Sequence, residues 1–324
     1  MAFISTKIIQ GKKRYYLEKS TRLKSGKVKK YSLYLKEYDT SKDYPIKDYE
    51  QKLDEKIIED RAKEYIPTPI FTSSLLEQLE TMKHEYHRII KTLSENQLQD
   101  VLNRFTVNFT YESNALEGNS LTLKDVTFVM QEGKILHGKN LREIYETLNT
   151  RIALEWIFNN KPLLTEKNIL TLHKILVKDT GVPLGYKKVP NFLLGRNVET
   201  TPPENVEKEM NQLLNWYKNN PQLHPLHKAI IFHGKFEKIH PFEDGNGRVG
   251  RLIINIILLS NGYPPLIIRK TQRVKYFHAL EAFDHNHMDN LSHFLIQKYK
   301  ETNEKFFKIY VKYLSNKTST LSSL

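Results

Sequence analysis

The twelve-residue segment His240–Arg251 concentrates side chains that could carry out chemistry on a phosphate ester. The imidazole of His240 can take up a proton near neutral pH. Asp244 offers the hard oxygen ligand that suits a magnesium ion bound to phosphates. Gly245 and Gly247 can adopt positive φ and let a ligand approach the backbone closely, so their amides can form an anion-binding nest.

The same segment predicts how these groups are positioned. Pro241 ends a helix near His240, because proline cannot continue a helix and disfavours helix at the residue before it. Asn246 is placed to cap a following helix, whose N-terminus offers free N–H groups. Arg248 and Arg251 project from one face of that helix, and we expect neither to be a buried core contact. Together these groups indicate a phosphoryl or nucleotidyl transfer site.

Other nucleotide and metal sites fit the segment less well. Its glycines spell GxGxxG, but a dinucleotide site requires a preceding strand and an acid about 20 residues later, where this chain has Ile268-Arg269-Lys270. The sequence has no GxxxxGK[ST] loop. A metal site on His233 and His240, seven residues apart, stays open, with a hydrogen-bonded packing role as the alternative for His233.

The segment resembles the Fic signature HxFx[D/E]GNGRxxR and matches it at every fixed position. Members of this family transfer AMP from ATP to a hydroxyl of a protein and release pyrophosphate. The resemblance implies that His240 deprotonates the target hydroxyl, Phe242 packs inward and Asp244 holds Mg2+ or Mn2+. The related Doc toxins phosphorylate instead and depart from the Gly-Asn-Gly segment, so nucleotidyl transfer is favoured. The implied phosphate-binding residues are Gly245, Asn246 and Gly247 for the α- and β-phosphates, Arg248 for the β-phosphate and Arg251 for the γ-phosphate.

A second motif, Ser113–Gly118, resembles the inhibitory pattern [S/T]xxxE[G/N] of the same family. Ser113 and Glu117 lie four residues apart on one helix face, and Gly118 ends the helix. A glutamate at a helix C-terminus meets the negative end of the dipole, which is tolerable in solvent or beside a cation. The resemblance names Arg251 as that cation, so ATP would bind in a pose unfit for transfer. The motif precedes the core, as in the class with an N-terminal inhibitory helix.

Two further regions resemble the family, and the likeness as a whole extends over residues 75–300. Residues 188–196, followed by Thr201-Pro202-Pro203, resemble the flap hairpin that pairs with an extended target segment by strand addition. Tyr276 lies where family members often contact the adenosine, and an ordinary core tyrosine is the alternative. The candidate docking residues of the flap are Lys188, Val189, Asn191, Phe192 and Leu193.

The elements that must position these residues are mostly helices. Apolar residues recur at helical spacing from Leu75 to Leu116, and Thr122 with Asp125 forms a capping box for another helix. Two runs rich in Tyr, Val and Leu predict an N-terminal β-hairpin, 13–19 and 27–35, followed by a helix from Tyr49. Further helices are expected over 140–159, 165–178, 203–219, 223–239, 247–260, 274–284 and 290–314.

We therefore predict a mostly α fold: a Fic-type helical core with a short β-hairpin flap within 181–200, plus a small N-terminal hairpin and helix. The expected domains are a basic appendage over 1–68, a Fic domain over 69–300 and a helix end with a tail over 301–324. With 324 residues, of which 39% are hydrophobic, the chain can bury a core.

Composition narrows the function classes. The chain has no cysteine, which excludes disulfides, thiolate catalysis and cysteine-bound metals. Its longest apolar stretch, Leu252–Leu259, is interrupted by Asn255 and is too short to span a bilayer. No signal peptide follows Met1, so we expect a soluble, cytoplasmic protein without a membrane partner.

The net charge of +13 is concentrated at the N-terminus, where residues 1–36 hold eleven lysines and arginines against one acid, Glu18. With the interleaved tyrosines, residues 7–36 could bind nucleic acid or an acidic partner. The alternative is a solvated hairpin whose lysines discourage edge pairing.

Three functions are compatible with the sequence. The first is an autoinhibited AMP-transferase acting on a protein target or on itself, with homo-oligomers possible. The second is removal of AMP at the same site. The third is a nucleic-acid-binding regulator with a vestigial core, against which the intact His240, Asp244, Arg248 and Arg251 argue.

Overall fold

A computed structural model describes residues 2–24, 26–36, 38–39, 44–133, 136–191 and 199–308. Residues Met1–His84 and Glu85–Leu324 form two compact units. Among the described residues, no helix combines the length and the apolar composition needed to cross a membrane.

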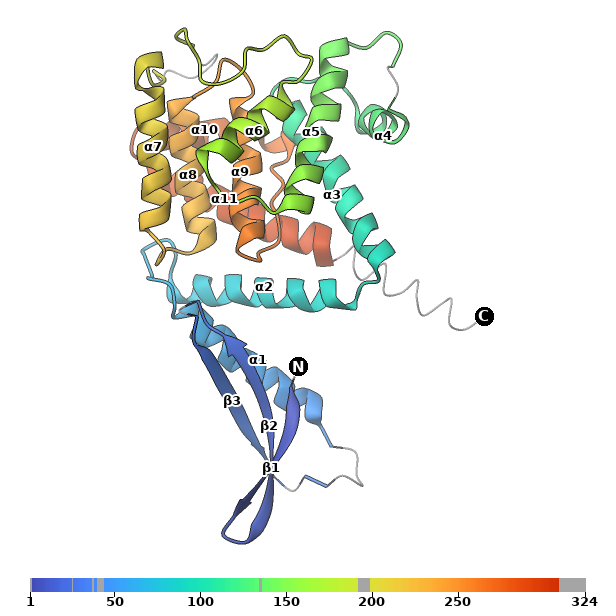
Figure 1. Cartoon of the computed structure of the whole chain (residues 1–324), viewed down its shortest axis with the longest axis vertical. Coiled ribbons are helices and arrows are strands. Elements are labelled where there is room, and N and C mark those ends of the chain that lie inside the picture. Colours follow the sequence, from blue (N-terminus) through green and yellow to red (C-terminus); the bar gives the residue numbers. More distant parts are fainter. Residues whose placement is uncertain are drawn as a thin grey trace. The chain divides into compact units, whose positions relative to one another are not determined.

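The N-terminal unit contains a three-stranded antiparallel sheet in the order β1-β2-β3 (Phe3–Ile9, Lys12–Arg22, Val28–Leu35), followed by α1 (Ile46–Ala62) (Figure 1). The predicted hairpin is confirmed as β2 and β3, whose register runs from Tyr15↔Leu35 to Arg22↔Val28. Strand β1 was not predicted. It joins β2 through Gln10 and Gly11, which both have positive φ, as a two-residue hairpin turn requires. The core of this unit is formed by Leu17, Tyr31 and Leu35 of the sheet with Leu53 and Ile57 of α1.

The second unit is a helical bundle, so the predicted mostly α fold is confirmed. Its last π-helical turn, η2 (Asn303–Lys308), ends the described chain, and the expected continuation to 314 lies outside the described residues. The boundary between the two units falls within α2 (Ser73–Thr92). The elements that follow α2 are α3 (Glu95–Leu116), α4 (Leu123–Glu132), α5 (Leu141–Asn160), α6 (Glu166–Leu176), α7 (Pro203–Asn219), α8 (Pro225–Ile239), α9 (Asn246–Ser260), η1 (Lys270–Gln272), α10 (Arg273–Asp284) and α11 (Met288–Thr302).

Helix α9 is the centre of the bundle, where it contacts α3, α5, α6 and α8 (Figure 1). Its sequence explains this place, because every residue from Leu252 to Leu258 is buried, and a helix that is apolar all round packs inside. Its one polar residue there, Asn255, donates to the carbonyl of Leu266 and accepts from the Leu266 amide, which holds the following segment against the helix.

The helix ends next to the sequence motifs follow their capping residues. Helix α3 ends at Leu116, and Gly118 takes φ 99°. Thr122 and Asp125 form the predicted capping box of α4, and Leu121 packs with Val126. The expected flap hairpin falls largely on residues 192–198, outside the described residues, and residues 181–191 contain no strand. The expected domain boundary at 68 lies inside the first compact unit, which reaches His84.

Candidate active site

His240 lies at the end of α8, directly before the loop that leads into α9. Its amide donates to the Phe236 carbonyl at 2.9 Å, and its backbone takes φ 51° because Pro241 stops the helix. This left-handed conformation is uncommon for a residue with a side chain, although histidine adopts it more often than most. The imidazole Nδ1 is 3.4 Å from the Glu237 carbonyl oxygen. The ring is half-buried at the edge of the α8–α9 loop.

Asn246 closes this loop and does not cap α9, which corrects the sequence prediction. The residue before α9 is Gly245, at φ 85°, and no side chain caps the helix. The Asn246 amide instead accepts from the Phe242 N–H at 2.9 Å and donates to the Phe242 carbonyl at 2.8 Å. Because the side chain of Asn246 satisfies the loop's own backbone, the first N–H groups of α9 keep no side-chain partner.

Phe242 is fully buried and stacks on His173 of α6, with ring centroids 3.9 Å apart. The Nε2 atom of His173 also lies 3.2 Å from the carbonyl oxygen of Asp244. Burial lowers the pKa of His173 to about 4, so the ring is neutral at physiological pH and its Nε2–H can donate to that carbonyl. This histidine, which the sequence analysis did not select, fixes the loop on the side of α6.

The two glycines of the signature have different reasons to be glycine. Gly245 needs its positive φ at the start of α9. Gly247 is helical, so positive φ is not its reason, contrary to the sequence expectation. A Cβ at Gly247 would overlap Oε1 of Glu117 and would lie 2.9 Å from Nη1 of Arg251. Its missing side chain therefore allows a carboxylate to rest on the backbone at the N-terminus of α9.

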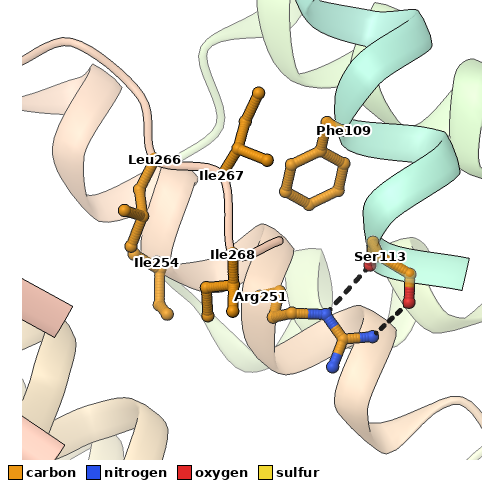
Figure 2. Close-up of a pocket in the computed structure, with 7 residues that line it drawn as sticks. All are labelled: Phe109, Ser113, Arg251, Ile254, Leu266, Ile267 and Ile268. Carbon is orange, nitrogen blue, oxygen red and sulfur yellow. Dashed lines mark hydrogen bonds between the residues drawn. The ribbon is translucent and has the colours of Figure 1, made fainter. Parts of the chain in front are cut away.

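Arg251 is 2% exposed and Arg248 3%, which contradicts the expectation that neither is buried. The stem of Arg251 runs along a small cavity lined by Phe109, Leu266, Ile267 and Ile268, which has room for about one water molecule (Figure 2). Figure 2 also shows the guanidinium pointing away from these apolar residues and toward Ser113. Its Nε donates to Ser113 Oγ and its Nη2 to the Ser113 carbonyl, both at 2.9 Å.

The carboxylate of Glu117 lies at the other side of this guanidinium, with its Oε1 2.7 Å from Arg251 Nη1. Burial is the largest single influence on the pKa of Arg251 and would lower it, but Glu117, Tyr276 and Glu237 together outweigh burial, and the pKa is raised. A buried guanidinium without an anion would be costly. Glu117 supplies that anion from the end of α3, while its own side chain remains 37% exposed.

The last turn of α3, directly before Glu117, is fastened to η1 and to the first residue of α10. The carbonyl of Leu116 accepts from Nε of Arg273 at 2.9 Å. One turn earlier, Glu112 accepts from the backbone N–H of Lys270 at 2.7 Å. The carboxylate that faces Arg251 is thus held by contacts outside the signature segment.

Arg248 shares a set of charges with α5. Its Nη1 is 3.4 Å from Glu146, its Nη2 is 3.5 Å from Asp244, and its buried Nε makes no hydrogen bond among the described residues. Asp244 in turn accepts from Nη2 of Arg142, whose Nε lies 3.4 Å from Glu146. Neither Arg142 nor Glu146 was selected from the sequence. Arg142 is half exposed, so its hold on Asp244 is open to solvent.

The donor set fits a magnesium ion that is shared with phosphates, and does not fit one held by protein alone. No group of three His, Cys, Asp or Glu residues among the described ranges could enclose a metal. Asp244 presents an exposed carboxylate, with Oδ1 accepting the Gly245 N–H and Oδ2 next to Arg142. Mg2+ is commonly bound by one or two carboxylates together with substrate phosphates and water. An ion at Asp244 would have to displace Arg142.

The candidate flap residues divide between the described and undescribed parts of the chain. Phe192 and Leu193 lie outside the described residues, whereas Lys188 and Val189 are exposed. Asn191 donates to the carbonyl of Phe242 at 2.8 Å, which ties the start of this segment to the signature loop.

Lys187, which was not selected from the sequence, adds two more ties. Its N–H donates to the Pro241 carbonyl, and its buried ammonium donates to Asn191 and Thr200. Desolvation lowers the pKa of Lys187 to about 8.

Tyr276 is completely buried, as is typical of a core tyrosine, which was the alternative to an adenosine contact. Its hydroxyl is 2.7 Å from Nε2 of His233, which is equally buried, so the two residues form a hydrogen-bonded pair inside the bundle. Burial raises the pKa of Tyr276 far above its usual value, and the hydroxyl keeps its proton.

Residues 163–258 match the model of the Fic/DOC family. The chain is 34% identical over 184 residues to a protein adenylyltransferase Fic of Nematostella vectensis, covering 54% of this chain and 42% of that protein. It is 33% identical over 187 residues to a probable protein adenylyltransferase of Aquifex aeolicus, covering 56% of each. The chain thus spans about half the length of these curated relatives.

Among solved structures, a Fic-domain-containing signaling protein from Bacteroides thetaiotaomicron superimposes with a TM-score of 0.64 at 27% identity. The superposition covers 71% of this chain and 97% of that one. The fold of this chain is therefore similar to that structure over nearly all of that structure's length.

Proposed function

We propose that the chain is a member of the Fic/DOC family, whose model it matches over residues 163–258, and that it transfers AMP from ATP to a hydroxyl of a protein target or of itself, under restraint by Glu117. One observation carries this proposal: an intact signature from His240 to Arg251 whose last arginine is paired with Glu117 at 2.7 Å. The remaining residues of the site support the same chemistry.

In the proposed reaction, a hydroxyl oxygen of the target attacks the α-phosphorus of ATP. A bond forms between that oxygen and phosphorus, and the bond from phosphorus to the α,β-bridging oxygen breaks, so that pyrophosphate leaves. The proton of the hydroxyl passes to the imidazole of His240, which the end of α8 presents beside the loop. Exposed Lys188 and Val189 would meet the target at the flap.

The N-terminus of α9 is suited to the triphosphate. Its first N–H groups keep no side-chain cap, and Gly247 lets an anion rest on the backbone. Buried Arg248 retains an unused Nε–H donor, and Arg251 already holds an anion, Glu117. At Asp244, a bound Mg2+ or Mn2+ would neutralise phosphate charge and help the pyrophosphate to leave.

Restraint follows from competition for one guanidinium. Glu117 occupies the Nη1 side of Arg251, where the γ-phosphate would have to bind. ATP that enters without displacing Glu117 lacks that contact, and its α-phosphate is not aligned for attack. Ser113 accepts hydrogen bonds from Nε and Nη2 of Arg251, which keeps the guanidinium from turning to serve both anions.

The exposure of Glu117 favours a second activity at the same site. One of its oxygens pairs with Arg251, while 37% of the side chain remains accessible to solvent. A carboxylate in this position could orient a water molecule toward the phosphorus of an AMP-modified protein. The same residue would then inhibit AMP addition and support AMP removal.

The direct test is incubation of the full chain with Mg2+ and ATP labelled on the α-phosphate, followed by mass analysis for added AMP. We expect incorporation that His240→Ala reduces by about 10²–10⁴-fold, the usual effect of removing a general base. Nucleotide binding should persist in that variant because the phosphate-binding residues remain. AMP transfer by His240→Ala within a factor of about three of wild type would overturn the assignment.

A further inference from the structure

The sheet of the N-terminal unit has one face covered by α1 and one that α1 leaves open. Leu17, Tyr31 and Leu35 point to α1, and the residues that alternate with them point to the other side. The register of the three strands places paired residues on the same face. We call this second side the open face, and it consists of Phe3, Ser5, Lys7, Ile9, Lys12, Arg14, Tyr16, Glu18, Ser20, Arg22, Val28, Lys30, Ser32 and Tyr34.

The cations on the two faces of the sheet differ in whether they form ion pairs. On the α1 side, Lys19 pairs with Asp54 and Lys29 with Asp60, each at 2.5 Å. On the open face, Lys12, Arg14 and Arg22 form no ion pair with any carboxylate that the structure describes. Helix α1 thus neutralises Lys19 and Lys29 on its own side, whereas Lys12, Arg14 and Arg22 leave positive charge on the open face that is unpaired within the described residues.

The single acid of the open face does not cancel this charge. Glu18 lies between Lys7, at 3.1 Å, and Lys30, at 2.5 Å, and its side chain is 1% exposed. The hydrogen bond from Lys30 is the main reason that the pKa of Glu18 falls to about 2, so this carboxylate stays charged and occupied. It holds two lysines in place and exposes almost no negative surface.

Aromatic rings lie among these cations. Tyr16 and Tyr34 are neighbours across β2 and β3 with ring centroids 5.4 Å apart, and Phe3 is 52% exposed. Lys7 lies 4.4 Å from the Tyr16 ring centre and Arg14 lies 5.8 Å from that of Tyr34. Phe3 and Tyr34 are exposed and Tyr16 is half-buried. Aromatic rings that alternate with cations on a sheet face are the two parts of a platform for unpaired bases and their phosphates.

We propose that the open face binds single-stranded nucleic acid, with bases stacked on Tyr34, Tyr16 and Phe3 and phosphates on Lys12, Arg14 and Arg22. The aromatic rings decide between the candidate polyanions, because a duplex keeps its bases stacked on each other and the carboxylate side chains of an acidic peptide have no aromatic face. Either of those ligands would use only the cations. The proposal concerns residues outside the proposed catalytic site and stands independently of AMP transfer.

The test uses the full chain and fluorescently labelled oligothymidine and oligouridine, with binding measured by fluorescence anisotropy between about 50 and 200 mM salt. Affinity should fall with salt, and Lys12→Gln should make the log–log slope shallower by about 0.7, the value for one phosphate contact on a single strand. Tyr34→Ala should weaken binding about fivefold or more through lost stacking. The two oligomers together show whether the 2′-hydroxyl matters.

Lys13 provides the matched control, because it is an exposed lysine next to Lys12 that points to the opposite face of β2. Lys13→Gln should leave both affinity and slope near wild type, and each variant should keep the wild-type melting temperature. His240→Ala should bind the oligomers normally, which separates this proposal from the catalytic one. Equal losses in Lys13→Gln and Lys12→Gln, tighter binding of a duplex, full competition by polyglutamate, or no binding at low salt would overturn the proposal.

Discussion

Replacing Glu117 by glycine is the sharpest test of the restraint on AMP transfer. The contact joins a carboxylate to a buried guanidinium across 2.7 Å. A charge-assisted contact of this kind contributes about 1.5–3 kcal/mol. Since each 1.4 kcal/mol is a factor of ten, its loss shifts the balance between restrained and competent states by about 10–100-fold. Because Glu117 is 37% exposed and solvent screens part of its charge, we expect the lower part of that range.

The assay is the initial rate of AMP incorporation into the chain itself at saturating labelled ATP. Glu117→Gly should raise this rate at least about tenfold and abolish any release of AMP from modified protein. Glu117→Gln keeps the shape of the side chain but loses its charge, so its rate should fall between wild type and Glu117→Gly. Its position in that order separates the charge from the space that the side chain fills.

The gain should also depend on the partner. Adding Arg251→Ala to Glu117→Gly should cancel the activation, because the freed guanidinium is its cause. Equal rates of wild type and Glu117→Gly would refute the restraint. Activation that survives the loss of Arg251 would show that Glu117 acts through a different contact.

Three further predictions concern stability and metal binding. Arg251→Ala should lower the melting temperature by about 5 °C, because the buried guanidinium joins α9 to Ser113 on α3. Arg142→Ala should tighten Mn2+ binding to the ATP-loaded chain severalfold in a calorimetric titration, because Arg142 holds Asp244. The N-terminal unit should lose stability in urea unfolding as the pH falls from about 4.5 toward 2, because Glu18 has its pKa lowered to about 2; Glu18→Gln should remove this dependence.

The sign of the last effect follows from proton binding. An unfolded Glu18 takes up its proton near pH 4.5, whereas the folded one resists protonation down to about 2, so acid favours the unfolded state. An unchanged melting temperature in Arg251→Ala would show that the guanidinium serves only the ligand. Unaltered Mn2+ affinity in Arg142→Ala would mean that Arg142 does not compete for Asp244. If the Glu18→Gln variant lost stability in acid as wild type does, groups other than Glu18 would be responsible for that loss.

The sequence was most informative where local chemistry alone decides structure. Pro241, Gly118 and the Thr122–Asp125 capping box each determine a helix end through their own backbone geometry or hydrogen bonds, and the structure has those ends. Strand β1 was missed because its alternation is weak, with exposed Ile4 and Ile8 on one side. Its only local signal is the Gln10-Gly11 turn.

The errors at the site have a common physical cause. Asn246 was expected to cap a helix, but its amide forms hydrogen bonds with the backbone of Phe242, four residues earlier. These bonds depend on how the loop folds. Arg251 was expected to be accessible, but α3 covers it from 138 residues away in sequence. Arg142 binds Asp244, which lies 102 residues away in sequence, and no local sequence pattern predicts such a contact.

The fastening of the last turn of α3 has a consequence for how the restraint operates. Glu117 belongs to the same molecule as Arg251, so it acts as a tethered anion whose effective concentration is set by geometry and not by how much protein is present. Dilution cannot release it. The hydrogen bonds of Leu116 to Arg273 and of Glu112 to Lys270 keep that concentration high. Any event that loosens η1 or the start of α10 would therefore raise the basal rate without changing the contacts of ATP or of the signature.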